Sequence, residues 1–217
     1  MFDYKAARDH MVESQIRTSD VTDLRVVKAF RTVARELFVP KSSKALAYAD
    51  VNIELGDGRA VMKPRDISKL IQAADVKPTD IVLDVACGRG YSTAILAQLA
   101  ETVIALEDTD ERVEKATGNL AEIGADNAVV VKGDIKSGAR EHGPFDVIFI
   151  NGAVGEVQKV WLDQLANNGR LVTIVQNDHI GHACVFTKSG DTVGERIEFD
   201  ACAPILPETV KPKAFAL

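Results

Sequence analysis

The sequence predicts an α/β fold: a doubly wound, mostly parallel sheet of the seven-stranded type with a helical N-terminal extension. In the larger C-terminal part of the chain, short apolar segments alternate with amphipathic helical ones. The run IVLDVA (81–86) is almost continuously apolar, as in a strand buried on both faces. A turn containing Gly88 and Gly90 follows it and opens a helix. We therefore expect an extension over 1–77 that packs on a core over 78–217.

The N-terminal third predicts helices and one hairpin. Apolar residues at helical spacing predict a helix over 5–17 and a second helix that follows Thr22. Over 51–62 the pattern changes to alternation, interrupted by the turn Gly56-Asp57-Gly58. Pro64 suits the first turn of a third helix.

The remainder predicts strands and helices in alternation. The expected strands are 81–86, 102–107, 127–131, 145–151 and 170–175, and the first, third and fourth of them are expected to be buried. The expected helices are 92–100, 110–123 and 157–165. An Asn167-Asn168-Gly169 turn precedes the last of these strands. The segments HACVFTK and VGERIEFDAC predict an antiparallel pair at the sheet edge. Ligands of such a sheet bind beyond the C-terminal ends of its parallel strands.

Composition predicts a cytoplasmic enzyme-like globule. The chain has 217 residues, 46% of them hydrophobic, and a formal net charge of -6, which argues against a nucleic-acid-binding protein. We see no apolar run long enough to span a membrane and no apolar signal core at the N-terminus. Three separated cysteines and four histidines without ligand spacing predict reduced thiols and no metal site.

The most informative stretch is DVACGRGYS, residues 84–92. A nicotinamide-type GxGxxG fingerprint fails, because a third glycine would have to stand where the sequence has Thr93. The pattern that fits is typical of methyltransferases, an acid followed by one spacer and GxGxG, with Ala86 in place of the first glycine. Asp84 at the strand end suits the ammonium group of S-adenosyl-L-methionine (SAM).

Acidic residues at the ends of the next two strands extend this site. Glu107 ends the second strand, where its carboxylate can accept hydrogen bonds from both ribose hydroxyls of SAM. Asp134 follows the third strand on the side of an adenine pocket, and Ile135 is a candidate ring contact. The predicted set for SAM, or its product S-adenosyl-L-homocysteine (SAH), is Asp84, Ala86, Gly88, Gly90, Tyr91, Glu107, Asp108, Asp134 and Ile135.

Several motifs give the chain a resemblance to the protein-L-isoaspartate O-methyltransferase family. They are RELFVP (35–40), AYAD (47–50), the cofactor loop with its helix, GPFDVIFINGA (143–153), LANNGRLV (165–172) and FDACAPIL (199–206). The resemblance implies a Rossmann-like SAM-dependent methyltransferase that repairs damaged proteins. Such enzymes methylate the α-carboxylate of an isoaspartyl residue, and the ester collapses to a succinimide that hydrolyses partly to normal aspartate.

The chain departs from this family in the loop on the acceptor side. The family loop usually reads G-Q-T-I-S-x-P, whereas this sequence has Gly58-Arg59-Ala60-Val61-Met62-Lys63-Pro64. Ala60 and Met62 replace both hydroxyl residues, so no catalytic residue can be assigned and activity is expected to be reduced. Ala60, Met62, Lys63 and Arg65 are the candidate substrate-binding residues, and Lys63 or Arg65 is the candidate to capture a carboxylate.

Three functions remain open from the sequence. The first is methylation of isoaspartyl residues in peptides or proteins, by a monomer or weak homo-oligomer. The second is a SAM-binding protein with lost or altered catalysis, acting as a sensor or scaffold. The third is a small-molecule methyltransferase that has kept the family's architecture.

Overall fold

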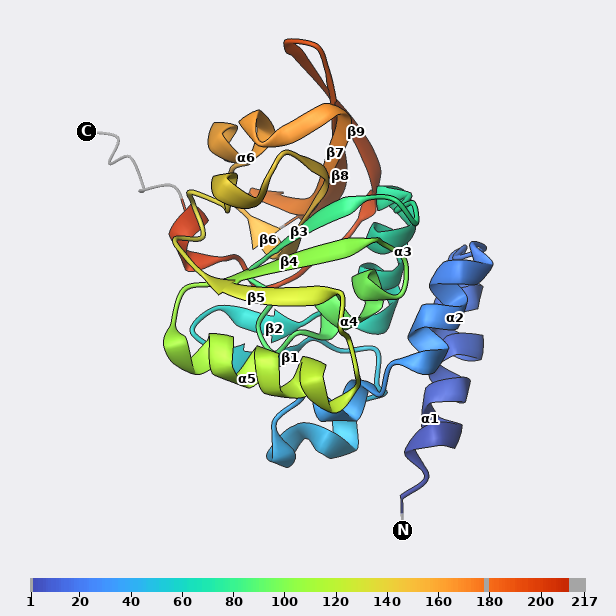
Figure 1. Cartoon of the computed structure of the whole chain (residues 1–217). Helices are drawn as coiled ribbons and strands as arrows, with labels where there is room; N and C mark the ends of the chain where they lie inside the picture. The colour runs from blue at the N-terminus through green and yellow to red at the C-terminus, as the bar shows by residue number, and fades with distance from the viewer. Residues whose placement is uncertain (1, 178–179, 211–217) are drawn as a thin grey trace, which may run out of the picture.

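The computed structural model describes residues 2–177 and 180–210. Its centre is a seven-stranded sheet in the order β5-β4-β3-β6-β7-β8-β9 (Figure 1). The first five strands in this order pair in parallel, and β7, β8 and β9 pair antiparallel. The strands are β3 (Ile81–Val85), β4 (Thr102–Glu107), β5 (Ala128–Lys132), β6 (Phe145–Val154), β7 (Leu165–Asn177), β8 (Ile180–Ser189) and β9 (Thr192–Asp200). The predicted fold class and the antiparallel edge pair are confirmed.

Helices cover both faces of the sheet. They are α3 (Pro64–Ala74), α4 (Tyr91–Ala97), α5 (Asp110–Glu122) and α6 (Lys159–Asp163), with short 3-10 turns at Arg35–Leu37, Lys41–Leu46, Arg140–His142 and Pro207–Thr209. Successive residues of β3 point to opposite layers: Val82 lies in one apolar cluster with α3 and α4, and Leu83 in another with Trp161. The continuous apolar run of β3 is therefore explained by burial on both sides.

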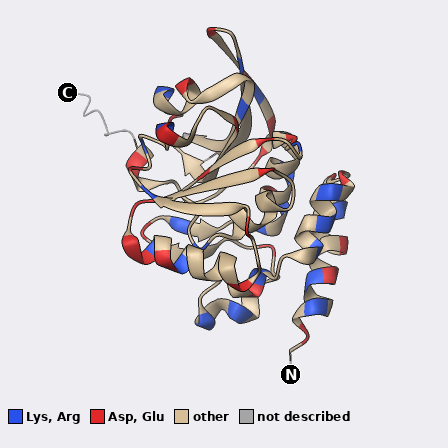
Figure 2. Ribbon diagram, in the orientation of Figure 1, with Lys and Arg blue, Asp and Glu red and all other residues tan. Residues whose placement is uncertain are grey.

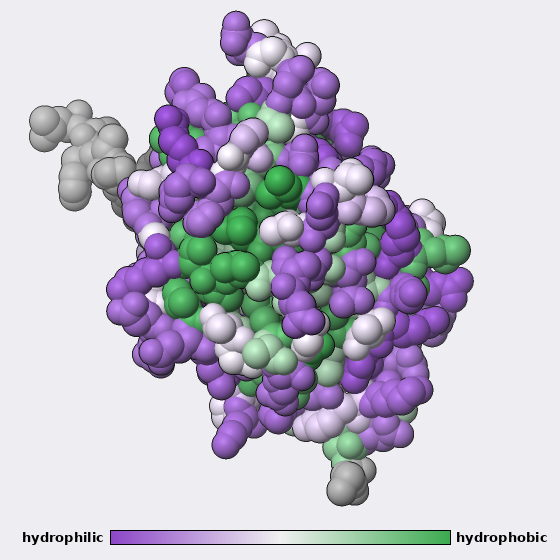
Figure 3. Space-filling model, in the orientation of Figure 1, coloured by the Kyte–Doolittle hydropathy of each residue, from purple (hydrophilic) through white to green (hydrophobic). Residues whose placement is uncertain are grey.

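Charged side chains lie mainly on the helices and loops, whereas the central strands carry few of them (Figure 2). On the face shown in Figure 3, hydrophobic residues gather over the strands and hydrophilic residues surround them. No helix in the described part of the chain has both the length and the apolar character that a membrane crossing requires.

The N-terminal segment is helical, as predicted. Helix α1 (Tyr4–Met11) is capped by Asp3 and continues through a π-helical turn (Val12–Ile16) and a 3-10 turn (Arg17–Ser19), and α2 (Leu24–Thr32) is capped by Asp23. Apolar residues of α1 and α2 share one core cluster with α3, α4 and the sheet. The division into 1–77 and 78–217 stays a prediction.

Two segments far apart in sequence meet at the C-terminal ends of the parallel strands. One is the hairpin of β1 (Ile53–Gly56) and β2 (Arg59–Val61). The other is the C-terminal segment (201–210), which forms hydrogen bonds with Ala153 at the end of β6. They touch at Gly58 (φ +74), where an added Cβ would clash with the Pro207 ring. Hairpin and C-terminal segment thus cover the edge where a doubly wound sheet binds ligands.

Three element predictions need correction. Strand β5 was expected to be buried, but it is the sheet edge and Val129 is 52% exposed. The Asn167-Asn168-Gly169 turn does not precede β7 but lies inside it as an irregularity, between the pairs Phe145–Leu165 and Val147–Arg170. Helix α6 is shorter than the predicted 157–165.

Candidate functional site

The predicted cofactor loop joins β3 to α4 in an unusual backbone conformation. Ala86, Gly88 and Gly90 have φ values of 60°, 62° and 90°. Glycine adopts this left-handed region freely, whereas an alanine there costs roughly 1–2 kcal/mol. Ala86 therefore adopts a backbone conformation that favours glycine. Two contacts hold it: its amide donates to the Leu106 carbonyl, and its carbonyl accepts from Asn151 Nδ2 at 3.1 Å.

Asp84 is completely buried at the end of β3. Its Oδ2 accepts hydrogen bonds from Ser92 Oγ at 2.7 Å and Thr93 Oγ1 at 2.6 Å, both from α4. Its Oδ1 has no partner among the described residues. Burial raises the pKa of Asp84 to about 7, against the hydrogen bonds from Thr93 and Ser92, which lower it. A buried carboxylate oxygen without a donor is suited to a cationic or hydrogen-bonding ligand group.

Glu107 lies beside Asp84, because β3 and β4 are neighbours in the sheet. Its side chain is fully buried, and its Oε1 accepts from the Gly88 amide at 2.7 Å. Its Oε2 accepts from the Asp108 amide at 3.2 Å. Burial raises the pKa of Glu107, while Arg59 and these two amides act in the opposite direction. Asp84, the carboxylate predicted to bind the ammonium group, and Glu107, the carboxylate predicted to bind the ribose, therefore lie at the ends of adjacent strands.

An arginine that the sequence analysis did not assign to the site occupies its centre. Arg59 Nε lies 3.2 Å from Glu107 Oε1 and 3.4 Å from Oε2, and the arginine side chain is 1% exposed. Arg59 Nη2 also contacts Asp108 Oδ2 at 3.2 Å and Glu208 Oε1 at 2.9 Å. Strands β2 and β4 and the C-terminal segment thus meet in one cluster of a guanidinium with three carboxylates. The replacement of the family's glutamine by Arg59 was the available signal for this cluster.

Of the two residues predicted to lie near the adenine, Ile135 is buried and Asp134 is exposed. Ile135 is 1% exposed, and its carbonyl accepts from Trp161 Nε1 at 2.9 Å, which fixes the segment after β5 against α6. Asp134 is exposed, and its carboxylate caps its own turn by accepting from the Lys136 amide and Ser137 Oγ. The structure thus gives Asp134 a local partner set, and its predicted part in an adenine pocket stays a prediction.

The side chain of Tyr91 lies away from the two carboxylates. Its ring packs against Phe30 and Phe38 from the N-terminal segment, and the Arg35 guanidinium lies 4.7 Å from the ring centroid. Asp108 lies next to Glu107 and accepts from Arg112 at 2.5 Å as well as from Arg59. Burial raises the pKa of Asp108, but the Arg112 and Arg59 contacts outweigh it and the pKa is low.

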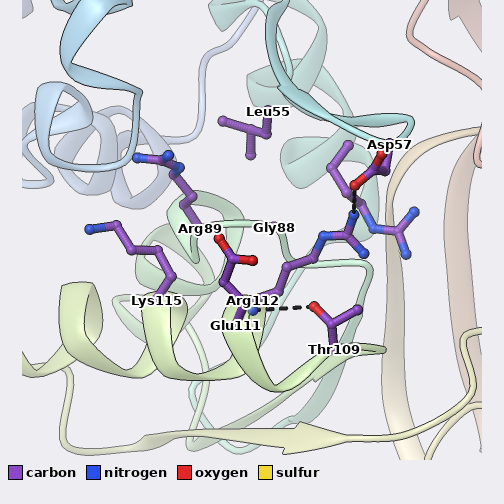
Figure 4. Close-up of a pocket in the computed structure, with 9 residues that line it drawn as sticks. Leu55, Asp57, Gly88, Arg89, Thr109, Glu111, Arg112 and Lys115 are labelled. Carbon is purple, nitrogen blue, oxygen red and sulfur yellow. Dashed lines mark hydrogen bonds and ion pairs between the residues drawn. The ribbon is translucent and has the colours of Figure 1, made fainter.

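A cavity of about 200 Å³ lies between the hairpin, the cofactor loop and α5. Figure 4 shows Arg89 and Lys115 on one side of it, and the Arg112–Asp57 ion pair on the other. Gly88 lines it, and the Leu55 side chain closes over that glycine, since a Cβ there would lie 2.9 Å from Leu55 Cδ1. The hairpin therefore packs directly on the cofactor loop.

The candidate acceptor residues are less accessible than the sequence suggested. Ala60 is 4% exposed and Met62 is fully buried in the main apolar cluster. Lys63 Nζ lies 3.2 Å from Asp66 Oδ2, and Arg65 Nη1 lies 2.6 Å from Asp66 Oδ1. Both cations thus already share a buried carboxylate, which weakens the expectation that either of them captures a substrate carboxylate.

Arg59, Asn151 and Glu208 contact the candidate site but were not assigned to it from the sequence. Asn151 ends the predicted strand FDVIFIN, so its position was visible, but its contact with the Ala86 carbonyl depends on the pairing of β3 with β6. Glu208 follows the last recognised motif and carried no signal. Within 2–177 and 180–210, no group of three or more His, Cys, Asp or Glu side chains is placed to hold a metal ion; His179 lies outside these ranges.

The chain is similar to known proteins of one family. The family model described as "Protein-L-isoaspartate(D-aspartate) O-methyltransferase (PCMT)" matches residues 6–206. Proteins named protein-L-isoaspartate O-methyltransferase from Methanoculleus marisnigri and Syntrophobacter fumaroxidans are 36% and 33% identical, over 77% and 88% of this chain and 76% and 88% of theirs.

Solved structures with that name share the fold. One superposes with a TM-score of 0.79 at 23% identity and covers 91% of this chain and 65% of its own. Another, from Plasmodium falciparum in complex with SAH, has a TM-score of 0.78 at 21% identity, over 96% of this chain and 100% of its own.

Proposed function

The chain belongs to the protein-L-isoaspartate O-methyltransferase family, and we propose that it transfers the methyl group of SAM to the α-carboxylate of isoaspartyl residues in peptides or proteins. The observation that carries this proposal is the convergence of Asp84, Gly88 and Glu107 at the ends of adjacent parallel strands. Of the three functions that the sequence left open, the comparisons favour the isoaspartyl enzyme, because the relatives carry its name.

The residues present fit SAM chemically. Asp84 offers a buried oxygen without a protein donor to an ammonium group, and Gly88 leaves room for backbone approach. Ile135 offers an apolar wall, and Glu107 offers acceptors for the ribose hydroxyls. Arg59 conflicts with this fit, because its Nε–H already donates to the Glu107 oxygens that the ribose hydroxyls would use. The cofactor supplies an electrophilic methyl group when bound.

The chain's own part in the reaction is alignment and exclusion of water. An acceptor carboxylate is ionised near neutral pH, so no general base is needed. Ala60 and Met62 offer no hydroxyl with which to orient the acceptor. A lost positioning hydrogen bond of this kind slows a reaction by on the order of 10²-fold. We therefore propose a reduced rate without a change of reaction class.

We further propose that the protein acts in the cytoplasm on peptides or proteins rather than nucleic acid, as a monomer or weak homo-oligomer. The net charge of -6 and the three unpaired cysteines support this proposal.

Labelled SAM with a pair of peptides tests the reaction. The peptides have the same sequence and differ only in isoaspartyl or normal aspartyl linkage. We expect base-labile label to accumulate on the isoaspartyl peptide alone, and less so with Glu107→Ala protein. Equal labelling of both peptides would refute the proposed substrate, and binding of SAH without any labelling would favour the non-catalytic alternative.

A further inference from the structure

Arg59 makes contacts that compete with the proposed use of Glu107. A carboxylate offers about four acceptor positions, two on each oxygen. Backbone amides fill one position on each oxygen of Glu107, from Gly88 on Oε1 and Asp108 on Oε2. The Arg59 Nε–H is shared between the two that remain, at 3.2 and 3.4 Å. Two ribose hydroxyls need these same two positions.

We propose that Arg59 is an intramolecular competitor for the ribose-binding carboxylate, and so the residue that sets cofactor affinity in this chain. The inference rests on the proposed function, because it takes Glu107 as the ribose acceptor. Arg59 is 1% exposed and Glu107 is 0% exposed, so their contact is shielded from solvent and is not a loose surface pair.

The guanidinium has other partners to retain when it releases Glu107. Its two terminal nitrogens face both oxygens of Glu208, at 2.9 and 3.3 Å, and one of them also contacts Asp108. Glu208 and Asp108 are 25% and 29% exposed, so the arginine can follow them without losing all charge partners. Only the Nε contacts with Glu107 must break, which makes the competition reversible.

Release of Arg59 also involves the hairpin. Arg59 begins β2, and Leu55 of β1 lies against the Gly88 position of the cofactor loop. On the other side, the amide of Leu206 and the hydroxyl of Thr209 hold the C-terminal segment to the end of β6 and the residues beyond it. The Arg59–Glu107 ion pair thus holds the hairpin against the cofactor loop, while the C-terminal segment stays bound to the end of β6. When the cofactor binds and this ion pair breaks, the hairpin is held less tightly against the loop.

Calorimetry with SAH tests the proposal. SAH lacks the sulfonium charge and has no net charge at neutral pH, so its affinity depends less than that of SAM on a general change in site charge. We expect Arg59→Gln, which restores the family's glutamine, to tighten SAH binding at least tenfold. It should also lower the urea midpoint of the ligand-free protein, because Glu107 and Glu208 lose their ion pair with Arg59 and Asp108 keeps only Arg112. Arg17→Gln is the matched control: it removes an exposed arginine that pairs with Glu13 instead of Glu107, and should change affinity by less than twofold.

A second variant keeps the test valid if Arg59→Gln does not fold. Glu208→Ala removes one of the two alternative partners and leaves Asp108, so Arg59 should hold Glu107 more firmly and SAH should bind several-fold more weakly. Where Arg59→Gln does fold, that loss should disappear in its background. Unchanged or weaker SAH binding by Arg59→Gln, or tighter SAH binding by Glu208→Ala, would overturn the inference. The proposed function would still stand in that case, provided that the wild-type protein binds SAH. No SAH binding by any variant would refute both.

Discussion

Replacing Asp84 with asparagine removes a buried charge while keeping the shape of the side chain. Asp84 is 0% exposed, and only its Oδ2 has protein donors. Asparagine can keep an oxygen toward Ser92 and Thr93 and place its amide at the unpartnered position. We expect the ligand-free variant to be more stable than the wild type at pH 8, although SAH binding weakens.

The magnitude follows from the pKa of Asp84, which burial raises from 3.8 to about 7. The native protein therefore keeps a proton that the unfolded chain releases, so stability from this group falls as pH rises from 3.8 toward 7. The difference between the two pKa values, 3.8 and about 7, corresponds to about 4 kcal/mol in the free energy of unfolding. Roughly 2.5 kcal/mol of this stability is lost between pH 5 and 8. An amide without a partner costs about 1–3 kcal/mol. The Asp84→Asn protein should therefore be about 1–3 kcal/mol more stable than the wild type at pH 8, and the two proteins should have nearly equal free energies of unfolding at pH 5.

Urea unfolding at pH 5, 6, 7 and 8 measures this difference. Asp80→Asn is the control, because Asp80 directly precedes β3 and is ion-paired with Arg170 at 2.6 Å. That variant should be destabilised at every pH. An Asp84→Asn protein less stable than wild type at pH 8, or a stability difference independent of pH, would contradict the argument from burial.

Three further perturbations test the rest of the site. Glu107→Ala should weaken SAH binding by about 1.5–3 kcal/mol by calorimetry, the range for a lost hydrogen bond to a charged group. NAD and NADP should protect the fold against heat less than SAM does, and better protection by either would contradict the assigned cofactor. Trp161→Phe should cost about 1–3 kcal/mol in urea, because the Ile135 carbonyl loses its donor; it should also weaken SAH binding, and unchanged affinity would remove Ile135 from the site.

The predictable part of this molecule was local in sequence or fixed by topology. The apolar runs of β3 and β4 and the Gly88–Gly90 turn specify strand, loop and helix within a few residues of one another. Once the strands are parallel neighbours, the acids at their ends must meet at one edge. Asp84 and Glu107 were therefore placed correctly beside each other without any knowledge of side-chain contacts.

The unpredicted part depends on long-range contacts and on position within the sheet. Val129 belongs to a run as apolar as the others, and only the strand order makes it an exposed edge residue. Arg59 and Glu208 are separated by 149 residues, and no periodicity relates them. The pairing of Lys63 and Arg65 with Asp66 had a local signal in their spacing, but the burial of Asp66 did not.

Hydrogen bonds to the backbone hold the acceptor loop in place. Arg35 Nη2 donates to the Met62 carbonyl at 2.8 Å, and the Lys63 amide donates to Asn52 Oδ1 at 2.8 Å. These contacts use the loop's backbone, so they survive the changes at Ala60 and Met62. The double change Ala60→Thr with Met62→Ser should then restore hydroxyls on an unchanged backbone and raise kcat/KM for an isoaspartyl peptide, with SAH affinity nearly unchanged.

The burial of Met62 adds a cost to this double variant that the sequence did not reveal. Emptying a fully buried methionine site costs about 2–5 kcal/mol, so unfolding must be measured alongside the rate. Ala60→Thr alone, at 4% exposure, gives a comparison that keeps Met62 in the core. A folded double variant with isoaspartyl activity at background would show that the loop serves another acceptor. A wild-type rate already equal to that of ordinary family members would show instead that the hydroxyls do not matter.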